Sequence, residues 1–288
     1  MKRLGEGPLR KMRARATDVV EYEFVLGDTA IAANPIIGRE LTLRFVGTIT
    51  CIHCGAVTPR SYAQGHCYGC FKKLAACDLC VVSPDRCHYA QGTCREPDWG
   101  ERNCIRPHLV YLANSSGLKI GLTRDDALPT RWIDQGATQA MLIAQVDTRQ
   151  QAGFVEKAIG AHVSDRTDWR TMVGRDPAEM DLPGEWARLR ELSADAIDAV
   201  QARFGERVIR LLDDEPVTHI VYPIERYPRD LRAFNLEKEP LVEGVLLGIK
   251  GQYLLLDTGV LNVRRITSFH VELSAGEAGA SPRQSELF

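Results

Sequence analysis

The sequence lacks long apolar runs: no stretch of about 18 apolar residues occurs in its 288 positions, so we expect no membrane-spanning helix and no membrane partner. The N-terminus is basic and has no apolar segment of its own, which argues against a secretory signal and favours a cytoplasmic protein. Internal repeats of solenoid period and heptads are also missing, so repeat arrays and coiled coils are excluded. The composition, 44% hydrophobic and 26% charged, is that of an ordinary soluble globular protein.

Charge is nearly balanced, with a formal net charge of -2, and this argues against a dedicated nucleic-acid coat protein. The distribution is uneven, because residues 1–16 carry six basic side chains and a single acid, Glu6. A weakly basic N-terminal half favours contact with a polyanion. A solvated surface with uneven charge accounts for the same pattern equally well.

Alternating apolar and polar residues within 17–50, in "VEYEFVLG" and "LTLRFVGTI", predict strands. Residues 152–163 and 189–212 repeat apolar side chains at helical spacing. The block 242–273 is rich in β-branched and aliphatic residues with turn signals between short runs, and it predicts three or four strands. The sequence therefore indicates separate β-rich and helical regions.

These patterns predict an α+β fold in three parts. An N-terminal module of strands and two zinc sites covers residues 1–104, and an α/β domain covers 105–215. A C-terminal β-rich element, 216–275, is expected to pack back on the N-terminal strands, with Lys250 exposed at a turn. The small and polar residues of 276–288 predict a disordered tail.

Nine cysteines in a chain expected to be cytosolic are poor candidates for disulfides, because the cytosol is reducing, and their clustering indicates metal binding. Two CxxC pairs come first, and together they offer four thiolates in the arrangement that a structural Zn²⁺ takes. A small residue such as Gly55 suits the tight turn of such a knuckle. The predicted ligands are Cys51, Cys54, Cys67 and Cys70.

The remaining cysteines predict a second site of four ligands, which a structural Zn²⁺ would also suit. Five thiols are available, so the choice of ligands stays open. We prefer the four cysteines that are evenly spread in the sequence, which excludes Cys77 from the site. The alternative uses the Cys77 and Cys80 pair as a knuckle together with two of the other cysteines. Four thiolates also suit an iron–sulfur cluster. The preferred ligands are Cys80, Cys87, Cys94 and Cys104.

Residues 108–124, "HLVYLANSSGLKIGLTR", contain two short apolar runs around a turn-forming NSSG and predict a β-hairpin. Tyr111 lies near the centre of the first strand and Lys119 lies on the second. Gly121 follows, where a glycine permits close approach of the backbone.

Two further residues complete a candidate site. Pro129 and Thr130 predict a helix start, which places Arg131 in the first turn, and Glu156 borders the apolar face of a later helix. A carboxylate that holds a hard metal ion, an arginine that neutralises a phosphate and a tyrosine or lysine that positions water suit phosphodiester hydrolysis. The alternative is a structural tyrosine, a solvated lysine and an ion-paired glutamate.

This order of residues resembles the core of the GIY-YIG endonucleases over about 105–165. "LVY" at 109–111 is similar to the first signature, "KIG" at 119–121 to the second, Arg131 to the helix arginine and Glu156 to the metal-binding glutamate. More broadly, residues 40–275 resemble an uncharacterised bacterial family that couples a cysteine-rich module to such a core. "CHYAQGTCREPDWGERNC" and "GIKGQYLLLDTGVLNVRR" are among the stretches that carry this second resemblance.

The endonuclease resemblance implies a small mixed sheet with flanking helices and one Mg²⁺ or Mn²⁺ held by Glu156. It also implies that Tyr111 assists a water molecule and that Arg131 stabilises charge on the phosphate. The sequence departs from the signatures at two positions: Leu109 stands where the family has glycine, and Lys119 stands where it has a second tyrosine. A lysine with a lowered pKa can act as a base, and a charged one binds phosphate.

Three functions follow as hypotheses. The first is a metal-dependent endonuclease that acts on DNA or RNA and contains structural zinc. The second is a zinc-containing protein that binds nucleic acid without cleaving it. The third is an adaptor whose zinc knuckles bind another protein, which the near-neutral charge permits.

Overall fold

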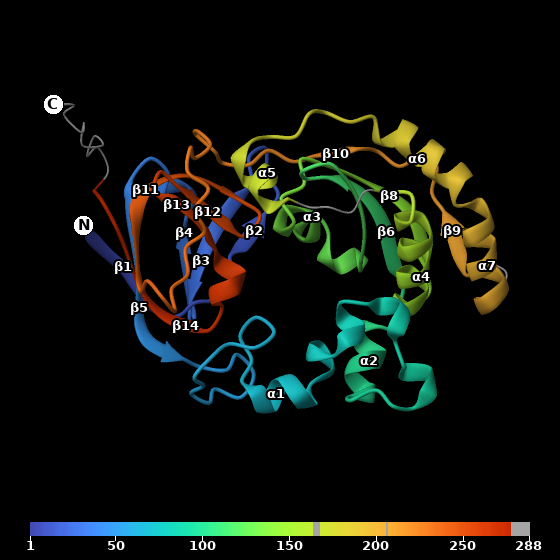
Figure 1. Ribbon diagram of the computed structural model, residues 1–288, viewed down its shortest axis with the longest axis horizontal. Coiled ribbons are helices and arrows are strands. Elements are labelled where there is room, and N and C mark those ends of the chain that lie inside the picture. The colour runs from blue at the N-terminus through green and yellow to red at the C-terminus, as the bar shows by residue number, and fades with distance from the viewer. Residues whose placement is uncertain (164–167, 206, 278–288) are drawn as a thin grey trace. The chain divides into compact units, whose positions relative to one another are not determined.

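The computed structural model describes residues 1–163, 168–205 and 207–277 (Figure 1). The expected tail, 276–288, lies outside the described residues from position 278 onward. None of the helices in the described part of the chain has the length and apolar character that crossing a bilayer requires. The α+β class expected from the sequence is confirmed, because several antiparallel sheets and separate helices make up the chain.

The chain divides into two compact units. Unit 1 consists of Met1–Cys70, Val173–Arg175 and Val221–Phe288, and unit 2 consists of Phe71–Met172 and Asp176–Ile220. Residue 104, after which the sequence predicts a boundary, lies within the first segment of unit 2. The first two CxxC pairs belong to unit 1, and the later cysteines belong to unit 2.

Unit 1 is built on an antiparallel sheet that combines strands from both ends of the chain (Figure 1). Along the chain its strands are β1 (Lys2–Pro8), β5 (Glu40–Ile49), β11 (Leu241–Lys250), β12 (Tyr253–Leu256), β13 (Gly259–Asn262) and β14 (Phe269–Ala275). Their spatial order is β1-β14-β5-β11-β12-β13. β14 alternates buried and half-buried residues, as expected for a strand with one face in a core. The C-terminal strands thus pair with N-terminal ones.

A second, smaller sheet of unit 1 orders β2 (Arg13–Arg15), β3 (Glu21–Leu26) and β4 (Thr29–Ala32) as antiparallel neighbours. In β3, Tyr22 and Phe24 are buried while Glu21 and Glu23 are exposed. This alternation is the period-two pattern of the sequence "VEYEFVLG".

Lys250 is fully buried, at 0% exposure, where the sequence led us to expect an exposed lysine. Its ammonium group donates to Tyr227 Oη at 3.1 Å and to the carbonyl oxygen of Arg175 at 3.4 Å. The rings of Tyr222 and Tyr227 lie 5.6 and 5.4 Å from the charge. Aromatic faces and hydrogen bonds compensate for the loss of water around the lysine.

The described residues of unit 2 form a sheet with β10 (Thr218–His219), β8 (Gln139–Val146), β6 (His108–Asn114) and β7 (Leu118–Thr123) in that order. A further strand, β9 (Ile209–Leu211), also pairs with β8. The predicted hairpin is present as β6 and β7. Each strand pair described in this sheet runs antiparallel, so it is not the mixed sheet that the endonuclease resemblance implied.

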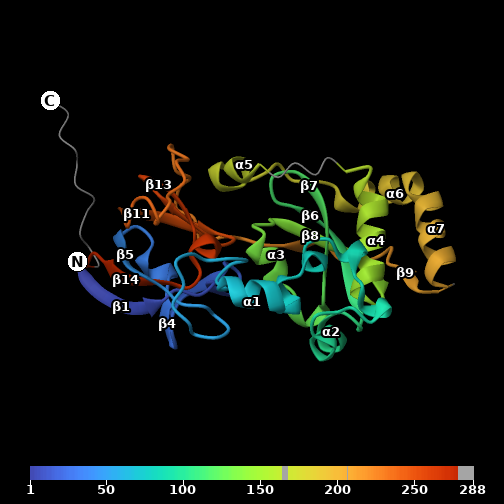
Figure 2. The same ribbon diagram turned by 60° about the horizontal axis from the view of Figure 1, so that its bottom comes forward.

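The helices are α1 (Tyr68–Lys73), α2 (Pro97–Asn103), α3 (Thr130–Asp134), α4 (Arg149–Gly160), α5 (Trp169–Gly174), α6 (Leu182–Leu192) and α7 (Ala194–Phe204). α4 and α6 pack against the unit 2 sheet, and α7 packs against α4 and α6 (Figure 2). The helical pattern at 189–212 is not one helix, because it breaks at Ser193, and its last part forms β9.

Helix α4 is fixed at its start and along one side. Thr148 and Gln151 form a capping box, in which each side chain accepts from the other residue's backbone N–H. Ala152, Val155 and Ile159 are buried in the core of unit 2. The cysteine-rich loop crosses the helix at Pro84 and Asp85, where the helix has Gly153.

We expect Gly153→Ala to destabilise unit 2. A Cβ at this position would lie 2.6 Å from the backbone nitrogen of Asp85 and 2.7 Å from Pro84 Cβ, so the loop would have to move. Overpacking of this kind costs about 1–3 kcal/mol. The matched control is Gly160→Ala on the same helix, where the nearest atom is Ile120 Cγ2 at 3.5 Å. Chemical denaturation should show a loss for Gly153→Ala and no loss for Gly160→Ala; equal effects would contradict the close approach.

Candidate metal centre and phosphate site

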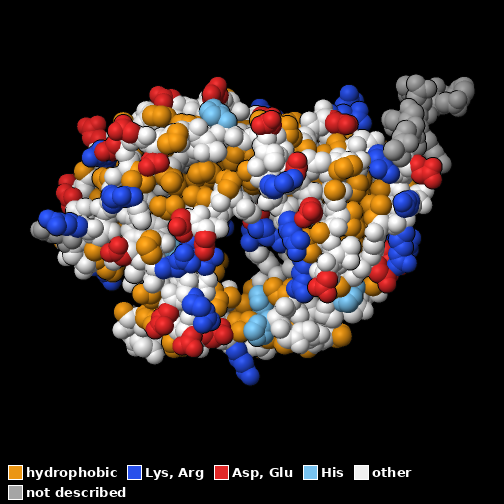
Figure 3. Space-filling view, turned by 180° about the vertical axis from the view of Figure 1, so that it is seen from behind, with side chains coloured by type: hydrophobic (Ala, Val, Ile, Leu, Met, Phe, Trp, Pro, Cys, Tyr) orange, Lys and Arg blue, Asp and Glu red, His pale blue; other side chains and the backbone are white. Residues whose placement is uncertain are grey.

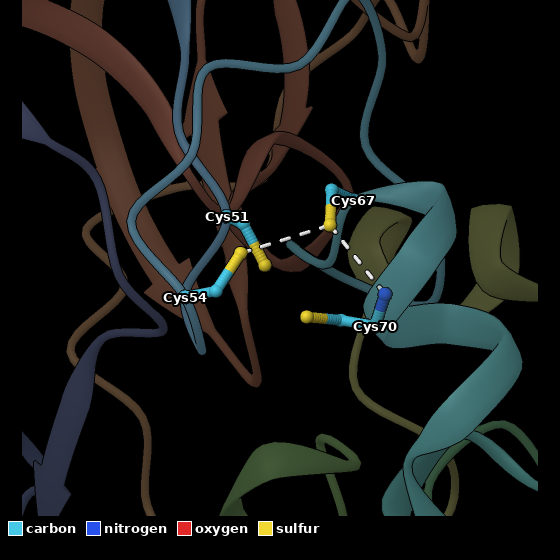
Figure 4. A group of neighbouring side chains, drawn as sticks. All are labelled: Cys51, Cys54, Cys67 and Cys70. Carbon is cyan, nitrogen blue, oxygen red and sulfur yellow. Dashed lines mark hydrogen bonds between the residues drawn. The ribbon is translucent and has the colours of Figure 1, made fainter.

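The first four cysteines come together in unit 1. Cys51 lies two residues after the end of β5, and Cys54 lies three residues further on in a tight turn. Gly55 adopts a left-handed conformation, with φ of 71°, as the knuckle requires. Cys67 and Cys70 lie at the start of α1. Figure 4 shows that all four sulfur atoms point toward one common point.

The spacing of these sulfurs suits a single metal ion. All four lie within 4.8 Å of one another, and the Sγ atoms of Cys54 and Cys67 are 3.8 Å apart (Figure 4). Zn–S bonds of about 2.3 Å in a tetrahedron place sulfurs roughly 3.8 Å apart. The backbone N–H of Cys70 points to Cys67 Sγ at 3.5 Å. The quartet is therefore a cysteine cluster that can hold zinc, as the sequence predicted.

The protonation of this quartet is uneven. Burial acts to raise the pKa of Cys51, but hydrogen bonds from the backbone of Cys54, Cys67 and His53 lower it to about 6. The pKa of Cys70 is raised, by burial and by hydrogen bonds with the other thiols. One thiolate is thus favoured at neutral pH, whereas further thiolates beside it need a cation.

The later cysteines lie in unit 2, around a small cavity of about 10 Å³. The residues lining it include all four preferred ligands, together with Asp78 and His88. Burial is the largest cause that raises the pKa of Cys80, to about 11, and that of Cys104. The lining residues do not include Cys77.

Tyr111 is buried, with 1% of its surface exposed, at the centre of β6. It pairs with Gly121 of β7, and a Cβ there would lie 2.6 Å from the tyrosine hydroxyl. The hydroxyl donates to Gln135 Oε1 at 2.5 Å, and the ring packs edge-on against Trp132 at 6.0 Å. The glycine thus leaves room for the tyrosine hydroxyl.

Arg131 and Glu156 are close enough to change the ionisation of Tyr111. Burial raises the pKa of Tyr111; the charge and hydrogen bond of Arg131 lower it, and the charge of Glu156 raises it. The tyrosine is therefore neutral at physiological pH. The buried Nε atom of Arg131 has no hydrogen-bond partner within the described residues. The described residues therefore leave the Nε–H donor of Arg131 without an acceptor.

Lys119 lies on the same face of the hairpin as Tyr111. It is two residues before Gly121 on β7 and pairs with Ala113, which is two residues after Tyr111 on β6. Side chains two residues apart on a strand point the same way, and paired residues share a face. Lys119 is half-buried.

The structure adds a residue that the sequence did not single out. Arg149, at the start of α4, is seven residues before Glu156, which is about two helical turns. Burial lowers the pKa of Arg149, and the charges of Cys104, Arg131 and Glu156 also act on it. This spacing of two helical turns from Glu156 is the sequence pattern that could have identified Arg149. The charge of Arg149 thus interacts with the second cysteine group, at Cys104, and also with Arg131 and Glu156.

His108 is another buried polar residue of β6, with 0% exposure. Its Nδ1 lies 2.8 Å from the carbonyl oxygen of Arg106, and its Nε2 has no partner among the described residues. Burial lowers the pKa of His108 to about 4, and the positive charges of Arg149, Arg124 and Arg106 add to this, whereas the hydrogen bond to the Arg106 backbone raises it. The ring is therefore neutral in the folded protein.

The chain matches the model of a protein family described as "Protein of unknown function (DUF2797)" over residues 38–271. The chain belongs to this family. No curated protein and no solved structure matches it. The family description assigns no activity, so the resemblance to the GIY-YIG core and the roles it implies stay predictions.

We expect purified protein to retain zinc at the first quartet. Cys54→Ser should lower the zinc content by one ion per chain and lower the temperature of unfolding, because metal binding contributes directly to folding free energy. His53→Ala, beside the same ligand, is the control and should keep its zinc. Mass-spectrometric metal analysis after dialysis measures both. Full zinc retention in Cys54→Ser would contradict the assignment.

The buried histidine predicts a pH dependence of stability. Because the pKa of His108 is about 4 when folded and 6.5 when exposed, its contribution is present above pH 6.5 and is lost as pH falls toward 4. Between about pH 7 and about pH 5 the wild type should lose about 2 kcal/mol more than His108→Gln. Urea unfolding of both proteins at the two pH values measures this difference, and parallel losses would refute it.

Proposed function

We propose that this protein is a metal-dependent phosphodiesterase that cleaves nucleic acid. Tyr111, Lys119 and Arg131 would act at the phosphate, and Glu156 would hold Mg²⁺ or Mn²⁺. The observation that supports this most strongly is the grouping of Arg131 and Glu156 near Tyr111, because the charges of both residues act on the buried tyrosine hydroxyl.

The chemistry of the grouped residues suits an anionic substrate. Arg131 has a buried Nε without a partner in the described part of the chain, and a guanidinium binds phosphate oxygens through two parallel hydrogen bonds. Lys119, on the same face, is a second basic side chain. Tyr111, neutral and fixed by Gln135, would orient a water molecule through its hydroxyl rather than act as a phenolate.

A divalent cation fits this group through Glu156. The carboxylate is half-buried on α4, and its charge reaches Tyr111. Hard cations such as Mg²⁺ take oxygen ligands and usually keep several waters, so one carboxylate together with the substrate phosphate is a sufficient donor set. When bound, the cation supplies positive charge at the phosphate and lowers the pKa of a coordinated water.

The loop of unit 1 that carries the cysteine quartet has features that suit nucleic acid. The guanidinium of Arg60 lies 5.3 Å from the ring of Tyr62, and the rings of Tyr62 and Tyr68 are 5.5 Å apart. Tyr68 is 57% exposed. Aromatic rings beside an arginine provide stacking and phosphate contacts for single strands.

These loop features also favour a second candidate function, nucleic-acid binding without cleavage. Basic and acidic side chains are interspersed over the face seen in Figure 3, so binding would depend on local contacts rather than on a uniformly basic surface. The replacement of signature residues at Leu109 and Lys119 agrees with a site that binds a phosphate without cleaving the ester.

The test is cleavage of single-stranded, duplex and branched DNA and RNA with Mg²⁺ or Mn²⁺. We expect the wild type to cut at least one substrate, Glu156→Gln to lose at least about 100-fold in rate and Arg131→Lys to lose a similar factor. Exposed Glu191 on α6 provides the control, Glu191→Gln, which should cut normally.

Cleavage by Glu156→Gln at the wild-type rate would refute the assigned role of the glutamate. Absence of cleavage by any of the proteins, together with binding that weakens steeply with salt, would refute the phosphodiesterase and favour the second candidate. Zinc content, measured on each preparation, excludes misfolding as the cause.

A further inference from the structure

A second group of side chains that can bind a metal lies in unit 2, beside the cavity lined by the later cysteines. In the described residues, the other group of potential ligand atoms within 4.8 Å of one another is Asp78, Cys80 and His88. All three residues line the cavity. Asp78 and His88 are not among the ligands that the sequence predicted, because the spacing of cysteines alone does not identify them.

The size of this cavity limits what it can hold. Its volume of about 10 Å³ corresponds to about one water-sized sphere, which is enough for a single metal ion. Ala75, Tyr89 and Trp99 line it beside the possible ligands. Gly100 of α2 also lines it, and a Cβ there would lie 2.8 Å from the Tyr89 ring. The closely packed wall thus leaves room for one ion and excludes a larger group.

The distance between the carboxylate and the imidazole suits two ligands of one ion. Asp78 Oδ2 lies 3.5 Å from His88 Nε2. Direct hydrogen bonds from nitrogen to oxygen are usually about 2.7–3.2 Å long. Zn–N and Zn–O bonds of about 2.1 Å at a tetrahedral angle place the two ligand atoms roughly 3.4 Å apart. The observed distance therefore fits a shared cation better than a direct hydrogen bond.

The hydrogen bonds of His88 leave its Nε2 atom available as a ligand. The hydroxyl of Thr93 donates to the backbone carbonyl oxygen of His88 at 3.3 Å, so the hydroxyl oxygen can accept from Nδ1 of the ring at 2.9 Å. On this basis we assign the ring proton to Nδ1, which leaves a lone pair on Nε2. A metal-binding histidine usually donates from its other ring nitrogen in this way. A lone pair beside the Asp78 carboxylate is stabilised by a cation between them.

The Asp78 carboxylate is held beside the cavity by an arginine. Arg95 Nε lies 2.6 Å from Asp78 Oδ2. The same guanidinium donates to the carbonyl oxygens of Phe71 and Leu74 at 3.1 and 3.3 Å. A carboxylate that binds a metal is commonly hydrogen-bonded to a further residue that fixes its orientation. The contact with Arg95 is therefore compatible with a role of Asp78 as a ligand.

We propose that Asp78, Cys80 and His88 bind a single zinc ion in unit 2. An oxygen, a sulfur and a nitrogen ligand together form a donor set that zinc accepts. One of the three remaining thiols that line the cavity completes the tetrahedral site. This ligand set differs from the four thiols that the sequence favoured. The assignment does not depend on the proposed phosphodiesterase activity.

The ion closes the segment of the loop that contacts α4. Its ligands come from both ends of residues 78–88. Between these ends, the carbonyl oxygen of Val81 accepts from the Arg149 guanidinium at 2.6 Å, and that of Cys87 accepts from the Gln150 side chain at 2.7 Å. Closing a loop through a metal ion reduces the entropy that the loop loses on folding. The ion therefore stabilises the contact between the loop and the helix.

The test is the zinc content of the full chain, purified with excess zinc, dialysed and measured by mass spectrometry. We expect two zinc ions per chain in the wild type and one in Asp78→Ala and in His88→Gln. One control is Asp85→Ala, which removes a carboxylate of the same segment that pairs with Lys157. The other is Cys77→Ser, which removes a thiol that is not among the lining residues. Both controls should keep two ions.

Cobalt substitution identifies the ligands independently of the zinc count. In Cys54→Ser, Co²⁺ should occupy the second site alone, and in His88→Gln it should occupy the first quartet alone. The thiolate-to-cobalt absorption per ion should be weaker in Cys54→Ser, because fewer thiolates bind the metal there than in the quartet. Circular dichroism of every variant, and retention of the first zinc ion in the variants of the second site, show that the proteins have folded.

Retention of two zinc ions by either Asp78→Ala or His88→Gln would overturn the proposal in favour of a site made of thiols. Equal cobalt absorption per ion in Cys54→Ser and His88→Gln would also overturn it, as would a single zinc ion in the wild type. None of these results depends on whether nucleic acid is cleaved, so failure of this proposal and failure of the proposed function are distinguishable.

Discussion

The close contact between helix α4 and the cysteine-rich loop is the constraint on which the candidate site of unit 2 depends. The loop crosses the helix at Gly153, where only a residue without a side chain permits Pro84 and Asp85 to approach so closely. Lys157 adds an ion pair to Asp85 at 3.1 Å, although at the surface such a pair contributes little. Because Glu156 lies on α4 close to Gly153, the contact between the helix and the loop also fixes the position of Glu156.

Much of this arrangement could be predicted from the sequence, because the relevant signals are local. The turn residues between two apolar runs specified the hairpin, and its register then fixed Tyr111 opposite Gly121. The CxxC spacing specified the first quartet, since two knuckles can close on one ion without help from the rest of the chain. The cores of α4 and of the C-terminal strands followed from hydrophobic periodicity.

Other features depend on contacts between distant segments and left no local signal. A lysine beside a turn is usually exposed. Lys250 is buried instead, and the rings of Tyr222 and Tyr227 pack against its ammonium group. The periodic pattern at 189–212 did not reveal the break at Ser193 or strand β9, since β9 is defined by its pairing with β8. Arg149 contacts a distant loop at Val81, which lies 68 residues earlier in the sequence.

The strand order of unit 1 has a consequence for folding during synthesis on the ribosome. β5 lies between β14 and β11, so both of its neighbours come from the last fifty or so residues of the chain. β5 is synthesised early, and it has neither of these two neighbours while all of unit 2 is synthesised. Nearly all of unit 2 consists of consecutive chain and can fold during that interval. An edge left open for so long is a site for mispairing with other chains, and protection of the nascent β5 edge is therefore a requirement that this topology places on the cell.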